Sequence, residues 1–232
     1  MEYCGKEVRL TAHQATYLSW LGLFDKIAHA DLFCLFDVCQ YERKSFENRN
    51  IIKTNSGLLM LTVPVESKGH FETKGKDVKI CPTGWARKHL RSIELAYSKA
   101  PYYDAYIGGL ESILTSNYEY LADLNLEILR WGMKSFGIKT PIVRASDYDF
   151  QGVKSGLVLD MCLKLGASEY VFGALGSDYA DKEAFAEAGV GIEFQDYNHP
   201  VYPQLFGQFA PYVSFIDLLL NCGPNSRRIL IN

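Results

Sequence analysis

The sequence predicts an α/β fold: a mostly parallel sheet flanked by helices, with an inserted β-hairpin and a helical middle section. Short apolar runs alternate with amphipathic segments in both halves of the chain, as strands and helices do in parallel sheets. A Gly-bearing turn between two β-branched runs indicates a hairpin near residue 57. Three helix-type segments in a row occupy about residues 85–136. With 232 residues and 48% apolar side chains, the chain is expected to fold as a single domain over 1–232.

The N-terminal segment is expected to form a right-handed βαβ unit. Residues 8–12 predict a short strand that ends at His13 and Gln14. Apolar side chains then recur at three- and four-residue spacing over residues 16–29, which predicts an amphipathic helix. Residues 31–38 are almost all apolar, as in a strand that is buried on both faces. Parallel pairing of the two strands requires a crossover between them, which is right-handed in nearly all proteins.

The rest of the chain continues this alternation around the middle section. The hairpin is expected from strands at 50–54 and 58–65, and a polar loop at 67–77 and a short strand at 78–81 follow it. The helices expected in the middle section span 85–97, 102–115 and 120–136. The later strands are expected at 142–146, 169–172 and 191–196, and the later helices at 155–165, 182–188 and 214–220.

Composition and charge exclude several classes of function. Lys plus Arg number 24 against 27 Asp plus Glu, so the net charge of −3 offers no basic surface for DNA. No apolar run approaches the ~20 residues that span a bilayer. The run at 15–24 resembles the apolar part of a signal peptide, but Asp25 and Lys26 end it, and a buried strand and helix is favoured. Six widely spaced cysteines without a C-x-x-C pair indicate reduced thiols, a cytoplasmic location and no metal site.

Polar residues follow three of the predicted strands. His13 and Gln14 follow the first, Asp37 to Gln40 end the second, and Gly173 to Tyr179 follow the strand at 169–172. Ligands of open α/β sheets bind outside the carboxyl ends of the strands, so these groups are expected to converge. Histidine has an unperturbed pKa of about 6.5 and can act as base or acid at neutral pH. His13 is therefore the first candidate for proton transfer, and a helix-capping or core histidine is the alternative.

A basic stretch follows at 40–53. It gathers four cations, and their guanidinium and ammonium groups suit the pyrophosphate of a nucleotide: Arg43, Lys44, Arg49 and Lys53. Gln40 and Asn48 add neutral hydrogen-bonding groups in the same stretch. The alternative is a solvated turn, in which Glu42 and Glu47 neutralise part of the charge.

Two further candidates lie near the C-terminal end. The loop at 198–204 contains two prolines and carries His199, Tyr202 and Gln204, a stock of reactive groups more typical of a functional loop than of a plain connection. Asp217 lies in an apolar helix, where an unpaired carboxylate is costly, so it is expected to pair with His13, His199 or a backbone amide. His89 has three basic neighbours on its helix and is expected at the surface.

Several stretches, in the same order along nearly the whole chain, together resemble one family. They are His13-Gln14-x-x-Tyr17-Leu18-x-Trp20-Leu21-Gly22, Lys26-Ile27-x-x-Ala30-Asp31, Asp37-Val38-x-Gln40, Asn48-Arg49-Asn50-x-Ile52-Lys53, Leu61-Thr62-Val63-Pro64-Val65, Lys99-Ala100-Pro101-Tyr102, Tyr170-Val171-Phe172-Gly173, Tyr179-x-Asp181, His199-Pro200-x-Tyr202-x-Gln204 and Ser214-x-Ile216-Asp217-Leu218-Leu219-x-Asn221-x-Gly223. In these stretches the chain resembles the WbqC-like proteins. It departs from them at Ala15, where the family usually has proline, and at Asp178, where related turns often carry a basic residue.

The resemblance implies a role in polysaccharide or O-antigen assembly, because the family occurs in such gene clusters beside enzymes for amino-sugar nucleotides. It implies attachment of an aminoacyl group, such as glycyl, or another acyl group to the amine of a nucleotide-linked amino sugar. The donor stays open between a carrier-bound thioester, an aminoacyl-tRNA and an ATP-activated amino acid, and the sequence requires no cofactor.

Chemically, this transfer needs a base for the sugar ammonium and donors for a tetrahedral oxyanion. The catalytic residues expected are His13 as base, His199 as second choice, and Asp217. The substrate-binding residues expected are Gln14, Tyr17, Trp20, Asp37, Gln40, Asn48, Arg49, Lys53, Gly173, Tyr179, Tyr202 and Gln204. Two alternatives remain: a non-catalytic module that binds a sugar nucleotide or scaffolds other enzymes, and an ATP-dependent amide ligase.

Overall fold

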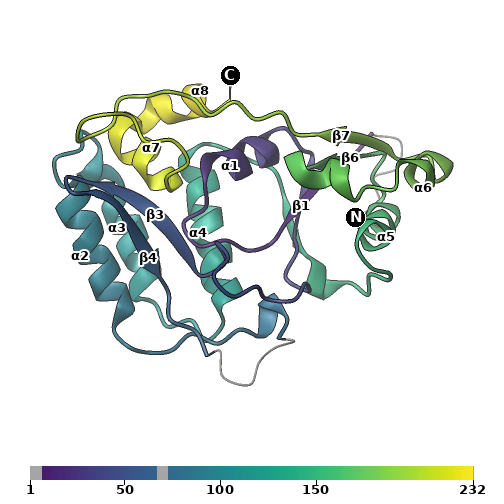
Figure 1. Ribbon diagram of the computed structural model, residues 1–232, viewed down its shortest axis with the longest axis horizontal. Helices are drawn as coiled ribbons and strands as arrows, with labels where there is room; N and C mark the ends of the chain where they lie inside the picture. Colours follow the sequence, from purple (N-terminus) through teal and green to yellow (C-terminus); the bar gives the residue numbers. More distant parts are fainter. Residues whose placement is uncertain (1–6, 67–72, 232) are drawn as a thin grey trace. The chain divides into compact units, whose positions relative to one another are not determined.

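The computed structural model describes residues 7–66 and 73–231, which divide into two compact units. We call the first the sheet unit; it consists of Met1–His13, Asp25–Phe36 and Lys139–Asn198. We call the second the helical unit; it consists of Gln14–Phe24, Asp37–Ile138 and His199–Asn232. Each unit is therefore assembled from segments that are far apart in the sequence. Figure 1 shows the elements of both units in the order of the chain.

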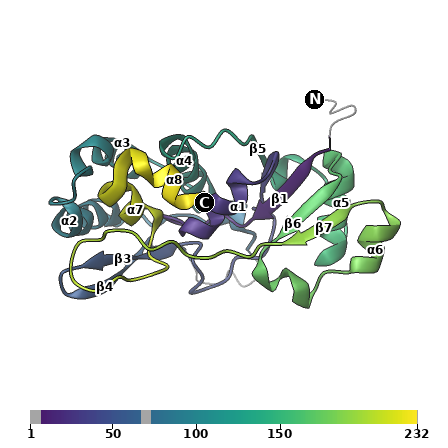
Figure 2. The ribbon, with the colours of Figure 1, turned by 90° about the horizontal axis from the view of Figure 1, so that it is seen from above.

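The sheet unit is built on five strands in the order β5-β2-β1-β6-β7, and every neighbouring pair is parallel. The strands are β1 (Arg9–His13), β2 (Leu32–Leu35), β5 (Ile142–Arg144), β6 (Glu169–Phe172) and β7 (Gly191–Phe194). The α/β prediction is thus confirmed, and the sheet is parallel throughout. Two helices of this unit follow β5 and β6, and Figure 2 shows them beside β6 and β7: α5 (Ser155–Leu165) and α6 (Lys182–Glu187).

The order of the strands locates the topological switch point of the sheet. Numbered within this sheet, β1, β2, β5, β6 and β7 are strands one to five, so the order reads 3-2-1-4-5. This is the order of doubly wound sheets, in which the chain winds outward from the centre in both directions. Because parallel crossovers are right-handed, the connections on the two sides of β1 lie on opposite faces. The carboxyl ends of β1 and β6 therefore meet at the topological switch point of the sheet.

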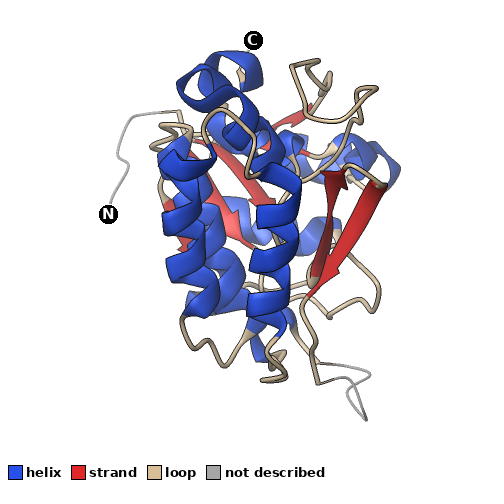
Figure 3. Cartoon of the chain, turned by 90° about the vertical axis from the view of Figure 1, so that its left-hand side faces the viewer, coloured by secondary structure: helices blue, strands red, loops and turns tan. Residues whose placement is uncertain are grey.

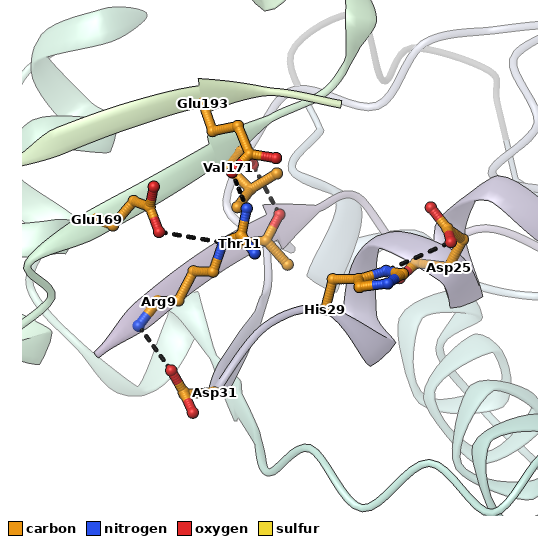
Figure 4. A network of polar contacts seen from close by, with 8 residues as sticks. All are labelled: Arg9, Thr11, Asp25, His29, Asp31, Glu169, Val171 and Glu193. Carbon is orange, nitrogen blue, oxygen red and sulfur yellow. Dashed lines mark hydrogen bonds and ion pairs between the residues drawn. The ribbon is translucent and has the colours of Figure 1, made fainter. Parts of the chain in front are cut away.

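A network of polar contacts joins the three neighbouring strands β1, β6 and β7 (Figure 4). The Arg9 guanidinium pairs with Glu169 at 3.1 Å and with Glu193, so one side chain of β1 joins β6 and β7. The Thr11 hydroxyl donates to the Val171 carbonyl at 2.8 Å, between β1 and β6. The Arg9 backbone N–H donates to the Asp31 carboxylate at 3.0 Å. These contacts hold the register that aligns the strand ends.

The helical unit contains the hairpin β3 (Arg49–Thr54) and β4 (Gly57–Thr62) and the long helices α2 (Trp85–Tyr97), α3 (Tyr103–Thr115) and α4 (Leu121–Ser135). The predicted hairpin and the three predicted helices are confirmed, and Figure 3 shows both. Two further helices follow at the C-terminal end, α7 (Phe215–Cys222) and the short α8 (Ser226–Leu230), the second of which carried no clear signal in the sequence.

The predicted first helix is shorter than its apolar spacing indicates. The expectation was 16–29, whereas α1 spans Leu21–Ala28. Leu18 has a φ of 44°, which no right-handed helix contains. The Asn50 amide donates to the carbonyls of Tyr17 and Leu18 at 3.1 and 2.8 Å, so tertiary contacts hold this segment outside the helix.

Other boundaries also shift where pairing is sparse. The strand predicted at 78–81 is reduced to isolated bridges, in which Lys79 faces Tyr120 and Ile80 faces Val65. Residues 67–72 of the predicted polar loop lie outside the described residues, and Gly75–Asp77 form one 3-10 turn.

An aromatic cluster fills the core of the helical unit and leaves no space beside Gly132. The rings of Phe24, Phe136 and Phe215 lie 4.7 to 5.9 Å apart, centroid to centroid. A Cβ at Gly132 would lie 2.6 Å from the Phe24 ring. The packing of the core therefore requires glycine at position 132, although glycine lowers the helix propensity of α4.

We expect Gly132→Ala to destabilise the protein by about 1–3 kcal/mol, because the added methyl group overpacks the aromatic cluster. Gly108→Ala is the matched control on α3, since nothing lies within 4 Å of a Cβ there. That change should stabilise the protein by roughly 0.5–1 kcal/mol through helix propensity alone. Urea unfolding of both variants measures the difference, and equal effects would contradict the packing.

Candidate functional site

The carboxyl edge of the sheet presents the first candidate site. His13 is the last residue of β1, is partly exposed, and pairs in register with Leu35 of β2. Its backbone carbonyl accepts from the Phe36 N–H at 2.8 Å, which holds the end of β1 against β2. Since β1 stands at the centre of the sheet, His13 lies at the switch point.

The turn after β6 reaches the same edge. Gly173 follows the last residue of β6, and Ala174–Asp178 form a 3-10 helix. A Cβ at Gly176 would lie 2.4 Å from the Cβ of Phe172, so the turn packs against the strand end only because glycine stands there. Tyr179, at the end of the turn, is half-exposed and sets its ring edge-on to Phe172 at 5.8 Å. His13 and Gly173 thus stand at the carboxyl ends of two paired parallel strands, and the convergence of these groups with Asp37 to Gln40 stays a prediction.

A buried lysine supports the end of β1. Lys26 of α1 is 4% exposed, and its ammonium donates to the Ala12 carbonyl at 3.0 Å. Burial lowers the pKa of Lys26 to about 8, so a substantial fraction of this amine is neutral in mildly alkaline solution. The only sign of it in the sequence was a lysine on a predicted amphipathic helix, a pattern that more often places the amine in solvent. Lys26 is therefore a functional candidate that only the structure provides.

The pH dependence of stability should reveal Lys26. Its pKa is lowered from 10.5 in the unfolded chain to about 8, so between these values the unfolded state binds more protons than the folded state. Stability contributed by this group therefore rises as the pH increases from about 8 to 10.5. We expect the wild type to gain up to about 3 kcal/mol over Lys26→Met across that window. Chemical denaturation at several pH values measures this, and a constant difference between the two proteins would refute it.

A second constellation lies in the helical unit, where four of the predicted residues meet. The Lys53 ammonium donates to Gln204 Oε1 at 3.1 Å and to the Gln208 carbonyl at 2.7 Å. Gln204 Nε2 donates to the Tyr202 hydroxyl at 3.3 Å. The Tyr97 hydroxyl donates to Asp217 Oδ2 at 2.8 Å and accepts from the Lys53 backbone N–H at 3.2 Å. We call Lys53, Tyr97, Tyr202, Gln204 and Asp217 the buried polar cluster.

Burial dominates the electrostatics of the buried polar cluster. Burial raises the pKa of Asp217, against the hydrogen bonds of Tyr97, Tyr202 and Gln204 and the charge of Lys53, which lower it. The pKa of Tyr97 is raised well above its usual value, chiefly by burial and then by Asp217, so its hydroxyl remains a donor. The expectation that Asp217 is paired is confirmed. Its partner is Tyr97 rather than a histidine or a backbone amide, because α2 ends where α7 passes.

His199 is held by the loop that contains it. Its Nε2 accepts from the Tyr212 N–H at 3.1 Å, and its Nδ1 lies 2.9 Å from the Pro200 carbonyl. This pattern assigns the proton to Nδ1. The rings of Tyr202, Phe209 and Tyr212 surround the imidazole, and burial lowers its pKa, which favours the neutral form. With its basic nitrogen already bonded to the Tyr212 amide, His199 is poorly suited to take a proton.

Most of the substrate-binding residues that were predicted between positions 48 and 53 have partners within the protein. The Asn48 amide donates to the Val63 carbonyl at 2.8 Å and is buried, so it supports the hairpin instead of facing a ligand. Arg49 and Lys53 stand at opposite ends of β3. Four residues of extended strand separate their Cα atoms by about 13 Å, so the two cations do not form one compact clamp.

The remaining predicted residues are distributed through the helical unit. Tyr17 is fully buried, and its hydroxyl contacts His89 Nδ1 at 2.8 Å, which leaves no face of its ring for a ligand. His89 is itself 6% exposed rather than at the surface, and burial lowers its pKa to about 4. Trp20 packs against Tyr212 with ring centroids 6.2 Å apart.

The last three predicted residues are Gln14, which follows β1, and Asp37 and Gln40, which follow β2. The Gln14 side chain hydrogen-bonds the Cys39 thiol, and burial, together with nearby Glu47 and Asp37, raises the pKa of this thiol to about 11. Asp37 is buried, and its backbone carbonyl accepts from the Lys76 N–H at 2.8 Å. Gln40 is exposed and forms an isolated bridge with Lys74. The raised pKa disfavours the thiolate form of Cys39 at neutral pH.

Comparisons with known proteins agree with the resemblance seen in the sequence. An uncharacterized protein of Mycobacterium tuberculosis (strain ATCC 25618 / H37Rv) is 36% identical over 212 residues, which cover 90% of this chain and 92% of that protein. No solved structure matches the chain. In the described part of the chain, no helix has both the length and the apolar character to cross a bilayer. The model of the WbqC-like protein family matches residues 14–229, so the chain belongs to that family.

Proposed function

We propose that this protein transfers an aminoacyl group, such as glycyl, or another acyl group to the amine of a nucleotide-linked amino sugar. The observation that carries the proposal is the switch point of the doubly wound sheet, where His13 ends β1 and the Gly173 turn follows β6. Nucleotides bind in the crevice outside such strand ends in many proteins of this topology. The family's association with amino-sugar nucleotides supports the same class of substrate.

The chemistry assigns a role to each group. His13 removes a proton from the sugar ammonium, and the free amine attacks the carbonyl carbon of the donor. The C–N bond forms, and the bond from the carbonyl to the leaving group breaks as the tetrahedral intermediate collapses. The proton that the new amide nitrogen loses passes to the leaving group or to solvent. Backbone N–H groups of the 173–178 turn suit the anionic oxygen of the intermediate or a phosphate of the nucleotide.

The identity of the acyl donor remains open, and the mass of the product identifies it. The purified protein is incubated with a set of nucleotide-linked 3-amino and 4-amino sugars and one donor at a time: a carrier-bound thioester, an aminoacyl-tRNA, or an amino acid with ATP. Mass spectrometry of the sugar nucleotide reports transfer as the added mass of the acyl group. Release of AMP or ADP in step with product favours an ATP-dependent ligase. Binding of the sugar nucleotide without product from any donor favours the non-catalytic module and overturns the transfer.

A further inference from the structure

The helical unit contains a cavity of about 450 Å³ between the hairpin and the C-terminal loop. It is lined by the end of β3, the turn to β4, and the loop at 206–210. Among the described residues that line it, Lys53 alone carries a charge. Leu58, Phe206 and Ala210 form apolar wall, and Thr54 and Asn55 add polar groups. Its volume lies within the range of small-molecule sites.

The lysine at this cavity lacks an ionic partner. Lys53 is 5% exposed, and both of its hydrogen-bond acceptors, the Gln204 side chain and the Gln208 carbonyl, are neutral. Within the described residues, no carboxylate forms a salt bridge with its ammonium. Asp217 is close enough for the charge of Lys53 to lower its pKa, but its hydrogen bonds are with Tyr97, Tyr202 and Gln204. A buried ammonium with two neutral partners has one N–H donor left and an unbalanced charge, which an anion would compensate.

The loop opposite Lys53 is held in a strained conformation. Phe206 has a φ of 63° and Gly207 a φ of 64°, so two consecutive residues occupy the left-handed region. For phenylalanine this conformation is unfavourable, and such residues are concentrated at ligand-binding segments. Here the strained pair lines the cavity and precedes Gln208, whose carbonyl binds the Lys53 ammonium. The strain therefore shapes the wall that faces the lysine.

We propose that this cavity binds an oxyanion, a carboxylate or a phosphate, that carries a small apolar or flat body. The Lys53 ammonium would bind the anionic oxygen with its remaining donor, and Leu58 and Phe206 would cover the body of the ligand. One lysine matches one negative charge, which suits a carboxylic acid or one phosphate of a nucleotide. Only the identity of the ligand, as the acyl donor or the sugar nucleotide, rests on the proposed function.

Calorimetric titration of the full-length protein tests this site with three probes: butyrate, inorganic phosphate and uridine diphosphate. We expect at least one probe to bind, and Lys53→Met to weaken it at least tenfold, as loss of a charge-assisted bond implies. Lys134→Met is the matched control, because Lys134 is exposed at the end of α4, and it should leave the affinity unchanged. Butyrate alone identifies a carboxylate ligand, and phosphate or uridine diphosphate identifies a phosphate ligand.

A second variant guards against misfolding of Lys53→Met. Leu58 is 59% exposed, so Leu58→Trp should fold and fill the cavity mouth, and it should weaken the same probe. Absence of binding at millimolar concentrations of all three probes overturns the site, as does unchanged affinity in both variants. No acyl donor is present in these titrations. They therefore measure binding independently of the transfer assay. Binding of a probe here, together with no product from any donor in the transfer assay, would keep this site and overturn the proposed reaction.

Discussion

Replacing His13 with alanine should reduce formation of the acylated sugar nucleotide by at least about 100-fold, the usual contribution of a general base. The imidazole stands at the end of the central strand, where the substrate amine is proposed to bind. The change keeps the hydrogen bond that the His13 carbonyl accepts from the Phe36 N–H, which holds the end of β1 against β2. Initial rates from mass spectrometry measure the loss, with circular dichroism to compare folding.

His29→Ala is the matched control in the same unit. His29 lies just after α1, its side chain is 48% exposed, and it pairs with Asp25 of its own helix. This variant should keep the wild-type rate. His199→Ala should lose less than His13→Ala, because the basic nitrogen of His199 is bonded to the Tyr212 amide. A His13→Ala protein that keeps the wild-type rate would assign proton transfer elsewhere, and Lys26 would be the next group to test.

Asp217→Ala should destabilise the protein by about 3 kcal/mol or more, the cost of breaking one side of a buried polar pair. The change leaves the buried Tyr97 hydroxyl without its acceptor and removes the carboxylate nearest the Lys53 charge. Asp217→Asn is the informative comparison, since its amide oxygen can still accept from Tyr97. Burial raises the pKa of Asp217, so the charged form is the costly one in the folded state.

The titration of Asp217 distinguishes the wild type from both variants, and the retained hydrogen bond distinguishes the variants from each other. A raised pKa means that the folded state binds the proton more tightly, so the stability from this group falls as the pH rises from 3.8 through the folded pKa. Asp217→Asn lacks that decline and should lie within about 1 kcal/mol of the wild type at pH 7. Urea unfolding at pH 7 measures both variants. Equal destabilisation by alanine and asparagine would show that the carboxylate charge, not the hydrogen bond, stabilises α7.

The apolar pattern predicted secondary structure best where local signals were complete. The helix at 155–165 and the strand at 169–172 have the predicted bounds, because Gly166 ends the helix in a left-handed conformation and a short apolar strand follows it. The start of α1 was predicted too early. Nothing local in residues 16–20 reveals that Asn50, far along the chain, binds the carbonyls of Tyr17 and Leu18.

The candidate residues divide in the same way. Lys53, Tyr202, Gln204 and Asp217 were each conspicuous by type and surroundings, and the structure brings them together in one cluster. Tyr97 and Lys26 were missed because a tyrosine at a helix end and a lysine on an amphipathic helix are ordinary residues until burial removes their solvent. The position of His13 at the switch point follows from the strand order, in which β6 pairs with β1.

By itself the sequence determined the fold class, the family and the residue types available for chemistry, because periodicity, turn residues and motif order are local properties of the chain. Only the tertiary structure decided which strands are neighbours, which polar groups lose their solvent and which of them meet. Those outcomes depend on contacts between distant segments. Burial in such contacts changes a pKa or leaves a charge without an ionic partner, and no local pattern in the sequence encodes either effect.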